Sequence, residues 1–515
     1  MDEKFHFLFN TLLHWYIAKL IHCYINITFT KKTRLNPFKS LFKDTFIYGL
    51  ATVLPRMLSF LLVPLYTEVF SKEEYGVVVF VFSYLIFFNV ILSYGMETTV
   101  FRFYNKKDDK SKVISTAWLS MLASSLIFLV LAYLFRLEIA NITDINLSYI
   151  NLIIWVLFFD AICVIPFTYL RIKKQSIRYA VIKLISVGVN LGLNIFFLLA
   201  LPVWKNHIET LETLCLDDSI NYIFISFVIA SALTVFMLLP FFFKLKYQFD
   251  VRLWKTMLNY SWPVLVAGLA FSINETLDKI LLNYILPENI SEAQVGVYGA
   301  CYKLSVFMTL FATAFRLGVE PFFFSHADSK NPKKAYALIA KYFTILGLLI
   351  LLGVTVFIDY LKLIIRGQEF YEALSIVPIL LLANLCLGIY HNLSVWYKVT
   401  DQTKFGAYIS GIGAILTIVI NIVFIPAYGF KASAIATLIA YGSMMILSYL
   451  LGQKYYKIDY PIKRISIYAL VGILFSGLYF YVLRDYLWIG ILMFVTYLLM
   501  LIKFEKNEIL QYLKK

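Results

Sequence analysis

Long apolar runs recur along the chain from Thr45 onward, and short polar stretches separate them. A run of about 20 apolar residues forms a helix long enough to cross a hydrocarbon core of roughly 30 Å. The pattern therefore predicts an all-α polytopic membrane protein with fourteen spans. We place these near residues 45–67, 76–100, 113–135, 148–170, 179–200, 219–243, 256–280, 295–318, 335–357, 371–393, 404–425, 432–452, 464–482 and 486–503.

The polar stretches between the runs predict the orientation. Alternate stretches carry most of the Lys and Arg residues in these loops, namely 101–112, 171–178, 244–255, 319–334, 394–403 and 453–463, although 394–403 contains a single Lys. Each stretch on the opposite side carries at most two basic residues. Basic loops remain on the cytoplasmic side of a membrane, so we expect these stretches and both chain ends to be cytoplasmic.

Composition narrows the class of protein. Of the 515 residues, 61% are hydrophobic and 15% are charged, against about 45–50% and about 25% in soluble domains. The net charge of +15 follows the alternate stretches, so we expect no nucleic-acid partner. The five cysteines have no metal-ligand spacing, and no metal site is predicted. With no nucleophile–base pair and no phosphate-binding glycine loop, we expect no catalytic residues and no enzyme activity.

Two short motifs recur at an offset of six spans. EYGV at 74–77 resembles QVGVY at 294–298, and GME at 95–97 resembles GVE at 318–320. Secondary transporters often contain such repeats. We therefore predict an N-lobe at 44–243, a C-lobe at 256–452, two added helices at 464–503 and a cytoplasmic tail at 504–515, with an extension of unassigned role at 1–43.

Several charged residues interrupt the apolar runs. A charge inside the bilayer is costly and usually faces a cavity or a charged partner. Arg56 lies near the middle of the first span, between Pro55 and Pro64. It is a candidate for binding an anionic group in a cavity, and the alternative is an ion pair with an acid such as Asp160.

Glu275, Asp278 and Lys279 lie close together in the seventh span. Glu275 and Asp278 share a helix face, and Glu275 and Lys279 have the spacing of an ion pair. Two interpretations stay open: Glu275 and Asp278 couple transport to H⁺ or Na⁺, or the group is a structural ion pair. Asp160 in the fourth span is a further candidate for ion coupling, and Lys183 in the fifth is another intramembrane charge.

Lys303 and Arg316 lie in the eighth span, thirteen residues apart. On a straight helix they are roughly 20 Å apart and do not share a face. Each is a candidate for binding an anionic substrate. The alternative partners are Asp278 for Lys303 and Glu320 for Arg316.

Several motifs resemble one known family. These are FIYGL at 46–50, LSFLLVPLYT at 58–67, EEYG at 73–76, LSYGME at 92–97, FRFY at 101–104, NETLDK at 274–279, GVYGACYK at 296–303, AFR at 314–316 and EPFF at 320–323. Over roughly residues 44–460 the chain resembles polysaccharide transporters of the O-antigen flippase type. That family belongs to the multidrug/oligosaccharidyl-lipid/polysaccharide (MOP) exporter superfamily.

The resemblance implies a flippase of the bacterial inner membrane. Its cargo would be an undecaprenyl-pyrophosphate-linked oligosaccharide of O-antigen, capsule or exopolysaccharide, moved to the outer leaflet by alternating access. In that role Arg56, Lys303 and Arg316 would contact the anion, while Glu275, Asp278 and Asp160 would couple an H⁺ or Na⁺ gradient. No cofactor is implied. Partners would be membrane lipids and, in the same pathway, a glycan polymerase with its chain-length machinery.

Two other functions fit the same helices. An ion-coupled drug or small-molecule antiporter of the same superfamily is the first, although a cation exporter favours acidic cavities over Arg56 and Lys303. The second is a membrane scaffold or glycan-assembly subunit without transport, which leaves the intramembrane charges unexplained.

Overall fold

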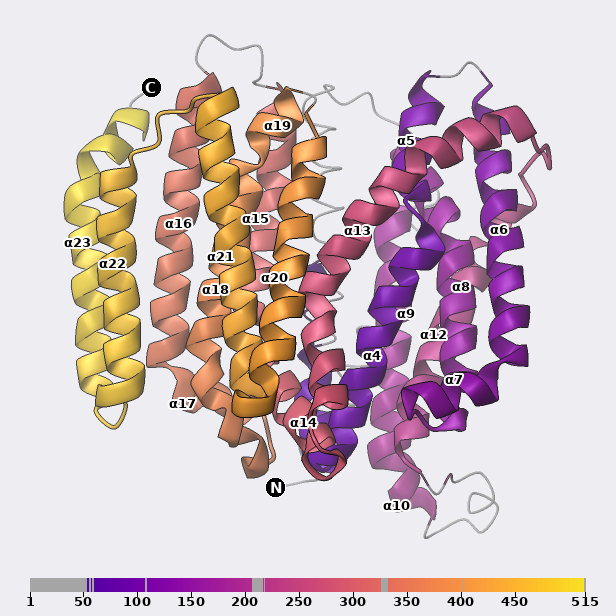
Figure 1. The fold of residues 1–515 in the computed structure, drawn as a ribbon, viewed down its shortest axis with the longest axis horizontal. Helices are drawn as coiled ribbons and strands as arrows, with labels where there is room; N and C mark the ends of the chain where they lie inside the picture. The colour runs from indigo at the N-terminus through magenta and orange to yellow at the C-terminus, as the bar shows by residue number, and fades with distance from the viewer. Residues whose placement is uncertain are drawn as a thin grey trace.

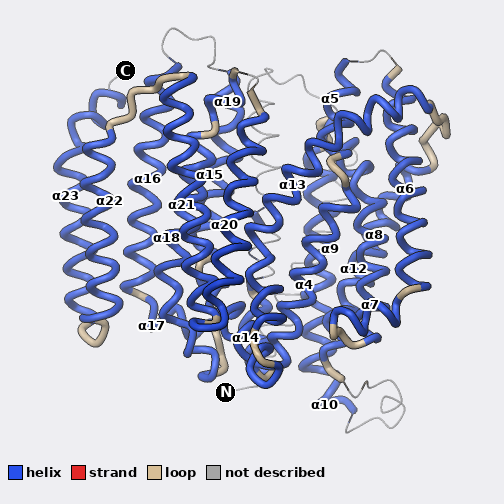
Figure 2. Tube along the Cα trace, viewed as in Figure 1, coloured by secondary structure: helices blue, strands red, loops and turns tan. Residues whose placement is uncertain are grey.

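The computed structural model describes residues 53–54, 57, 60–106, 109–205, 216, 218–325, 332–400 and 402–513. Helices make up nearly all of this part, and it contains no strand (Figure 2). Within it, 11 helices are long and apolar enough to cross a membrane, or 12 if one bent pair counts as one span. The all-α membrane fold is thus confirmed. The count of fourteen stays a prediction, since the span at 45–67 lies mostly outside the described residues and α13 is not among the eleven.

The N-terminal half forms one group of helices (Figure 1). Its helices are α3 (Leu62–Val69), α4 (Lys72–Ser93), α5 (Met96–Lys106), α6 (Lys110–Leu134), α7 (Arg136–Thr143), α8 (Leu147–Ile172), α9 (Ser176–Ile195), α10 (Leu201–Lys205) and α12 (Ile220–Phe242). Polar residues begin several of them. At α4, the Ser71 hydroxyl accepts a hydrogen bond from the Glu74 amide, and the Glu74 carboxylate accepts one from the Ser71 amide.

The C-terminal half forms a second group beside the first (Figure 1). Its helices are α13 (Val251–Ile285), α14 (Glu288–Leu304), α15 (Val306–Ser325), α16 (Pro332–Val356), α17 (Ile358–Leu361), α18 (Val377–Leu393), α19 (Val395–Val399), α20 (Lys404–Tyr428), α21 (Phe430–Tyr455), α22 (Ile462–Leu478) and α23 (Leu487–Leu513). The residue boundaries that we predicted for the two lobes stay predictions.

Helix α13 joins the two groups. It has 35 residues, and Figure 1 shows it running diagonally from the top of the first group to the lower middle of the molecule. It packs against α4 on one side and α20 on the other. Near Pro263 it meets Gly95, whose positive φ of 69° separates α4 from α5. A Cβ at Gly95 would lie 2.9 Å from the Ser261 carbonyl oxygen, so only glycine suits this crossing.

The two groups touch most closely where α4 crosses α14, at the lower end in Figure 1. A Cβ on Gly76 would overlap the Glu292 carbonyl, and a Cβ on Gly296 would overlap the Lys72 carbonyl. We call this pair the glycine contact. Its two residues are the equivalent glycines of the motifs at 74–77 and 294–298. The sequence repeat therefore meets itself in space.

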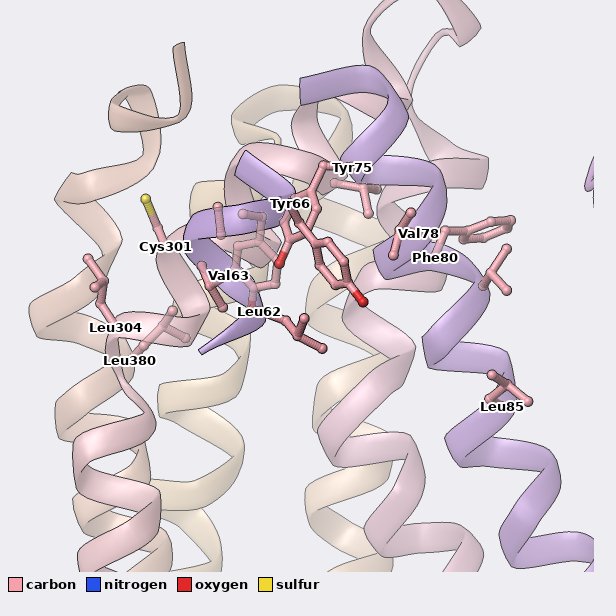
Figure 3. Packing of buried hydrophobic residues seen from close by; sticks show 14 of the residues in the cluster. Leu62, Val63, Tyr66, Tyr75, Val78, Phe80, Leu85, Cys301, Leu304 and Leu380 are labelled. Carbon is pink, nitrogen blue, oxygen red and sulfur yellow. The ribbon is translucent and has the colours of Figure 1, made fainter. Parts of the chain in front are cut away.

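Buried side chains surround the glycine contact. Figure 3 shows Tyr66 and Tyr75 close to α14 residues Cys301 and Leu304. The Tyr75 ring also meets the Phe370 ring edge-on, with 5.6 Å between centroids. Cys301 donates from its thiol to the Phe370 carbonyl at 3.3 Å. Tight backbone approach and aromatic packing thus hold the two groups together at this end.

Helices α22 and α23 are fastened to the second group at both ends. Near the C-terminal end of α23, the buried Lys341 of α16 donates to Glu505 at 2.6 Å. Tyr468 of α22 donates to the same carboxylate at 2.7 Å. At the turn between α22 and α23, Arg484 forms a two-pronged ion pair with Asp359 at 2.8 and 3.0 Å. The hydrogen-bonded ion pair with Arg484 lowers the pKa of Asp359 to about 2.

Gly76→Ala is expected to destabilise the folded protein by about 1–3 kcal/mol, since a methyl group there must push the α14 backbone away. The thermal unfolding midpoint of the purified protein measures this. Gly442→Ala is the matched control, because nothing lies within 4 Å of a Cβ at Gly442. Equal midpoints for Gly76→Ala and wild type would show that the two helices do not approach so closely.

Lys341→Met is expected to cost about 3–5 kcal/mol, because it leaves the Glu505 charge buried without its cation. The double variant Lys341→Met/Glu505→Leu should recover most of that loss, since it removes both charges. Thermal midpoints of the single and double variants test this. If both are equally unstable, the cost comes from packing and not from charge pairing.

Candidate functional site

Six side chains of α13 and α14 form a charged cluster, which we call the α13–α14 cluster. Its members are Glu275, Asp278, Lys279, Tyr298, Tyr302 and Lys303. Asp278 and Lys279 are buried, and the Lys279 ammonium donates to the Asp278 carboxylate at 2.8 Å. The second oxygen of that carboxylate accepts from the Tyr298 hydroxyl at 2.6 Å. Asp278 is thus fully engaged by protein groups.

Lys279 has two further contacts. Its ammonium donates to the main-chain carbonyl of Glu275 at 3.0 Å, and it lies 4.3 Å from the centre of the Tyr302 ring. A ring face attracts a cation, and this attraction grows when water is excluded. The spacing of Glu275 and Lys279 predicted a pair of side chains. In the structure Lys279 contacts the Glu275 backbone and the Asp278 carboxylate instead.

Polar side chains of α20 and α21 support the cluster. Asn274, one residue before Glu275, accepts from the Thr417 hydroxyl at 2.8 Å and donates to the Ser410 carbonyl at 3.2 Å. Its own carbonyl accepts from the Tyr441 hydroxyl at 3.3 Å. These buried hydrogen bonds fix this part of α13 and leave the cluster little freedom to rearrange.

Lys303 differs from Lys279. Its side chain is exposed, although much of the protein surrounds its position. It lies fifteen residues beyond Glu288, the start of α14, or roughly 22 Å along the axis. The nearby charges that act on it are Lys279 and the half-buried Glu275. Among the described residues, no ion pair holds its amine.

Asp160 lies in the other group of helices, on α8. It accepts from the Ser231 hydroxyl of α12 at 2.9 Å, and Asn89 of α4 is a further hydrogen-bonding partner. Lys183 of α9 is the cation that acts on it. The Lys183 ammonium also lies 4.3 Å from the centre of the Phe167 ring. Each group of helices therefore contains a carboxylate, Asp160 or Asp278, with a lysine near it.

Arg316 lies on α15, beyond a bend of 49° between α14 and α15. The bend means that the straight-helix argument for Lys303 and Arg316 does not apply. Arg316 is half-buried, and His391 of α18 lies within its electrostatic reach. The side chain of Glu320, its predicted alternative partner, is outside the described part.

Arg56 lies outside the described residues, so its predicted role stays a prediction. At the ends of the first group of helices, Arg171 pairs with Glu97, and Arg102 lies 4.2 Å from the centre of the Tyr260 ring. Glu97 and Arg171 are both substantially exposed, and such a pair contributes little stability.

Sequence reasoning missed the tyrosines of the cluster and the Lys341–Glu505 pair. Tyr298 and Tyr302 lie within the motif GVYGACYK, but nothing in that motif assigns them a contact with Asp278 or Lys279. Lys341 and Glu505 carried a signal, because each is a charge inside or at the end of an apolar run. Pairing them required knowing that α16 and α23 are neighbours.

A separate cavity of about 560 Å³ lies between α6 and the first turns of α13. Its lining includes Leu119, Ser120, Phe249, Trp254 and Leu258. The Ser120 hydroxyl is already engaged, with Trp254 donating to it at 2.8 Å and Tyr94 bonded to it at 2.9 Å. This cavity is apolar and contains no charged side chain, so it does not suit an anionic ligand.

Two groups of apolar helices, each with a carboxylate and a lysine in its interior, define a polytopic membrane protein. The chain belongs to the polysaccharide biosynthesis protein family, whose model matches residues 41–317, more than half of the chain. A second family model, MatE, matches residues 263–423. The family resemblance inferred from the motifs is confirmed.

Several known proteins are similar to this chain in structure or in sequence. The inward closed conformation of the lipid II flippase MurJ has a TM-score of 0.72 and 17% identity, over 90% of this chain and 99% of that one. An inward-facing multidrug resistance MATE transporter of the MOP superfamily has a TM-score of 0.61 and 13% identity, over 82% and 95%. A probable low-salt glycan biosynthesis flippase, Agl15 of Haloferax volcanii, is 19% identical over 44% of this chain and 48% of its own length. The chain thus covers about half of this curated relative.

The stability of substituted proteins should distinguish charges that are paired within the protein from charges that are not. Asp278→Ala is expected to lower stability by about 3–5 kcal/mol, because it leaves the buried Lys279 ammonium without its counter-charge. Lys303→Ala should stay within about 0.5 kcal/mol of wild type, because its exposed amine has no ion pair among the described residues. Thermal midpoints measure both, and an equal loss in the two variants contradicts the distinction.

Proposed function

We propose that the chain is a flippase that moves an undecaprenyl-pyrophosphate-linked oligosaccharide from the inner to the outer leaflet of a bacterial cytoplasmic membrane. The cargo is a repeat unit of O-antigen, capsule or exopolysaccharide. The chain performs no bond-making chemistry, and both of its ends are cytoplasmic. Membership of the polysaccharide biosynthesis family supports this proposal, together with similarity to two proteins named as flippases.

The observation that carries the proposal is the exposed amine of Lys303. A lysine at this depth needs a counter-charge, because an isolated charge inside a membrane is costly. Asp278 does not supply it, since that carboxylate is held by Lys279 and Tyr298. A pyrophosphate offers several acceptor oxygens and negative charge, which is what a free ammonium binds. Arg56 and Arg316 are the further candidate contacts of the anion.

The path of the cargo follows from the arrangement of the two groups of helices. The glycine contact holds them together at one end, and the basic stretches lie at the other. Alternating access requires the glycine contact to open while the opposite ends approach. Coupling of this movement to an H⁺ or Na⁺ gradient would use a carboxylate inside one of the two groups of helices, with Glu275, Asp278 and Asp160 as candidates. In the cell, a glycan polymerase and its chain-length machinery would act on the flipped product.

An ion-coupled drug or small-molecule antiporter is the alternative function. The MatE model match and the fold similarity to MATE transporters favour it. A cationic drug, however, would meet Lys303 as a repelling charge. The two functions therefore differ in the sign of the charge that the internal space should accept.

The decisive experiment uses cells that lack this chain and have lost a surface glycan. They are complemented with wild type, Lys303→Ala or Arg56→Ala at matched membrane levels, and the leaflet that holds the lipid-linked glycan is determined. We expect wild type to restore export and Lys303→Ala to lose most of it, since the pyrophosphate loses its cation. Lys463→Ala is the control, because it removes an exposed lysine at the start of α22.

Two results would contradict the proposal. If the leaflet distribution of the glycan does not depend on the chain, the flippase function is wrong and the antiporter becomes the leading function. If the chain is required but Lys303→Ala exports as well as Lys463→Ala does, the flippase function stands and the anion site is elsewhere.

A further inference from the structure

The surroundings of the Lys279 ammonium are those of a bound cation. Its oxygen neighbours are an Asp278 carboxylate oxygen at 2.8 Å and the Glu275 carbonyl at 3.0 Å. The Tyr302 ring face lies 4.3 Å away. Carboxylate and main-chain carbonyl oxygens are also the groups with which membrane transporters hold Na⁺. A side chain of the protein thus lies where such an ion would bind.

The charges of the α13–α14 cluster balance without an added ion. Glu275 and Asp278 are acidic, and Lys279 and Lys303 are basic. The other groups that face the cluster are Tyr298, Tyr302 and Tyr441, together with uncharged polar side chains of α20 and α21. A further cation at Asp278 would lie within a few ångströms of the Lys279 ammonium. Two like charges at that separation repel strongly where water is excluded.

We propose that Lys279 is a built-in cation that fills the carboxylate site of Asp278, so that this site takes no Na⁺. This inference deepens the proposed function and rests on it only for its consequence in transport. It removes Asp278 from the candidates for gradient coupling and leaves Glu275 as the carboxylate of this cluster without a bonded cation.

The test measures Na⁺ itself on the purified full-length chain. Binding of ²²Na⁺ and the thermal unfolding midpoint are followed as NaCl replaces choline chloride at constant ionic strength. Wild type and Asp278→Asn should both show no saturable response. Lys279→Ala should instead bind Na⁺ saturably, because it frees the carboxylate and the carbonyl oxygens. The double variant Lys279→Ala/Asp278→Asn should lose that gain.

Lys279→Arg is the matched control, because it keeps the positive charge and should show no Na⁺ response. The inference is overturned if the wild-type protein binds Na⁺ saturably and Asp278→Asn abolishes that binding. If Lys279→Ala does not fold, Lys279→Gln replaces it, and failure of Lys279→Gln to gain Na⁺ binding also overturns the inference. None of these measurements involves a glycan, so they stay independent of the flipping assay.

Discussion

A charge buried among apolar helices must be neutralised by another group, and this constraint organises the polar interior of the protein. Asp278 has Lys279 and Tyr298, and Glu505 has Lys341 and Tyr468. In each case, a tyrosine hydroxyl occupies a carboxylate oxygen that the lysine leaves free. Both pairs are local or inter-helical supports, and neither needs a ligand to be complete. Lys303 stands apart, because its side chain is exposed and no ion pair holds it among the described residues.

The intramembrane charges therefore fall into two kinds, those paired within the protein and those open to a ligand. Engaged charges stabilise the helix packing, and a change there affects folding before it affects transport. An available charge costs stability in the resting protein and is retained where a ligand neutralises it. Lys303 and the half-buried Glu275 belong to this second kind. They lie on neighbouring helices at the same cluster, so a ligand that approaches one lysine also changes the surroundings of one carboxylate.

Much of the fold could be predicted from the sequence, because helix length and the alternation of basic stretches follow from the bilayer itself. The candidate residues Glu275, Asp278 and Lys303 could also be found, since a charge in an apolar run is conspicuous. Their pairing could not. The spacing of Glu275 and Lys279 favoured one partner, while the structure gives Asp278, the adjacent residue. Tyr298 and Tyr302 of the next helix complete that arrangement, and the sequence does not show which residues of α13 they contact.

The glycine contact has a consequence for how the two halves relate. Gly76 and Gly296 are equivalent positions of the repeat, and each makes room for the backbone of the other half. That is the geometry of an isologous dimer interface, where a patch meets its own copy across a two-fold axis. A duplicated ancestor with one such glycine would have acquired both sides of the contact at once. The charged residues differ between the two halves, whereas the contact between them is reciprocal: Gly76 lies against Glu292, and Gly296 lies against Lys72.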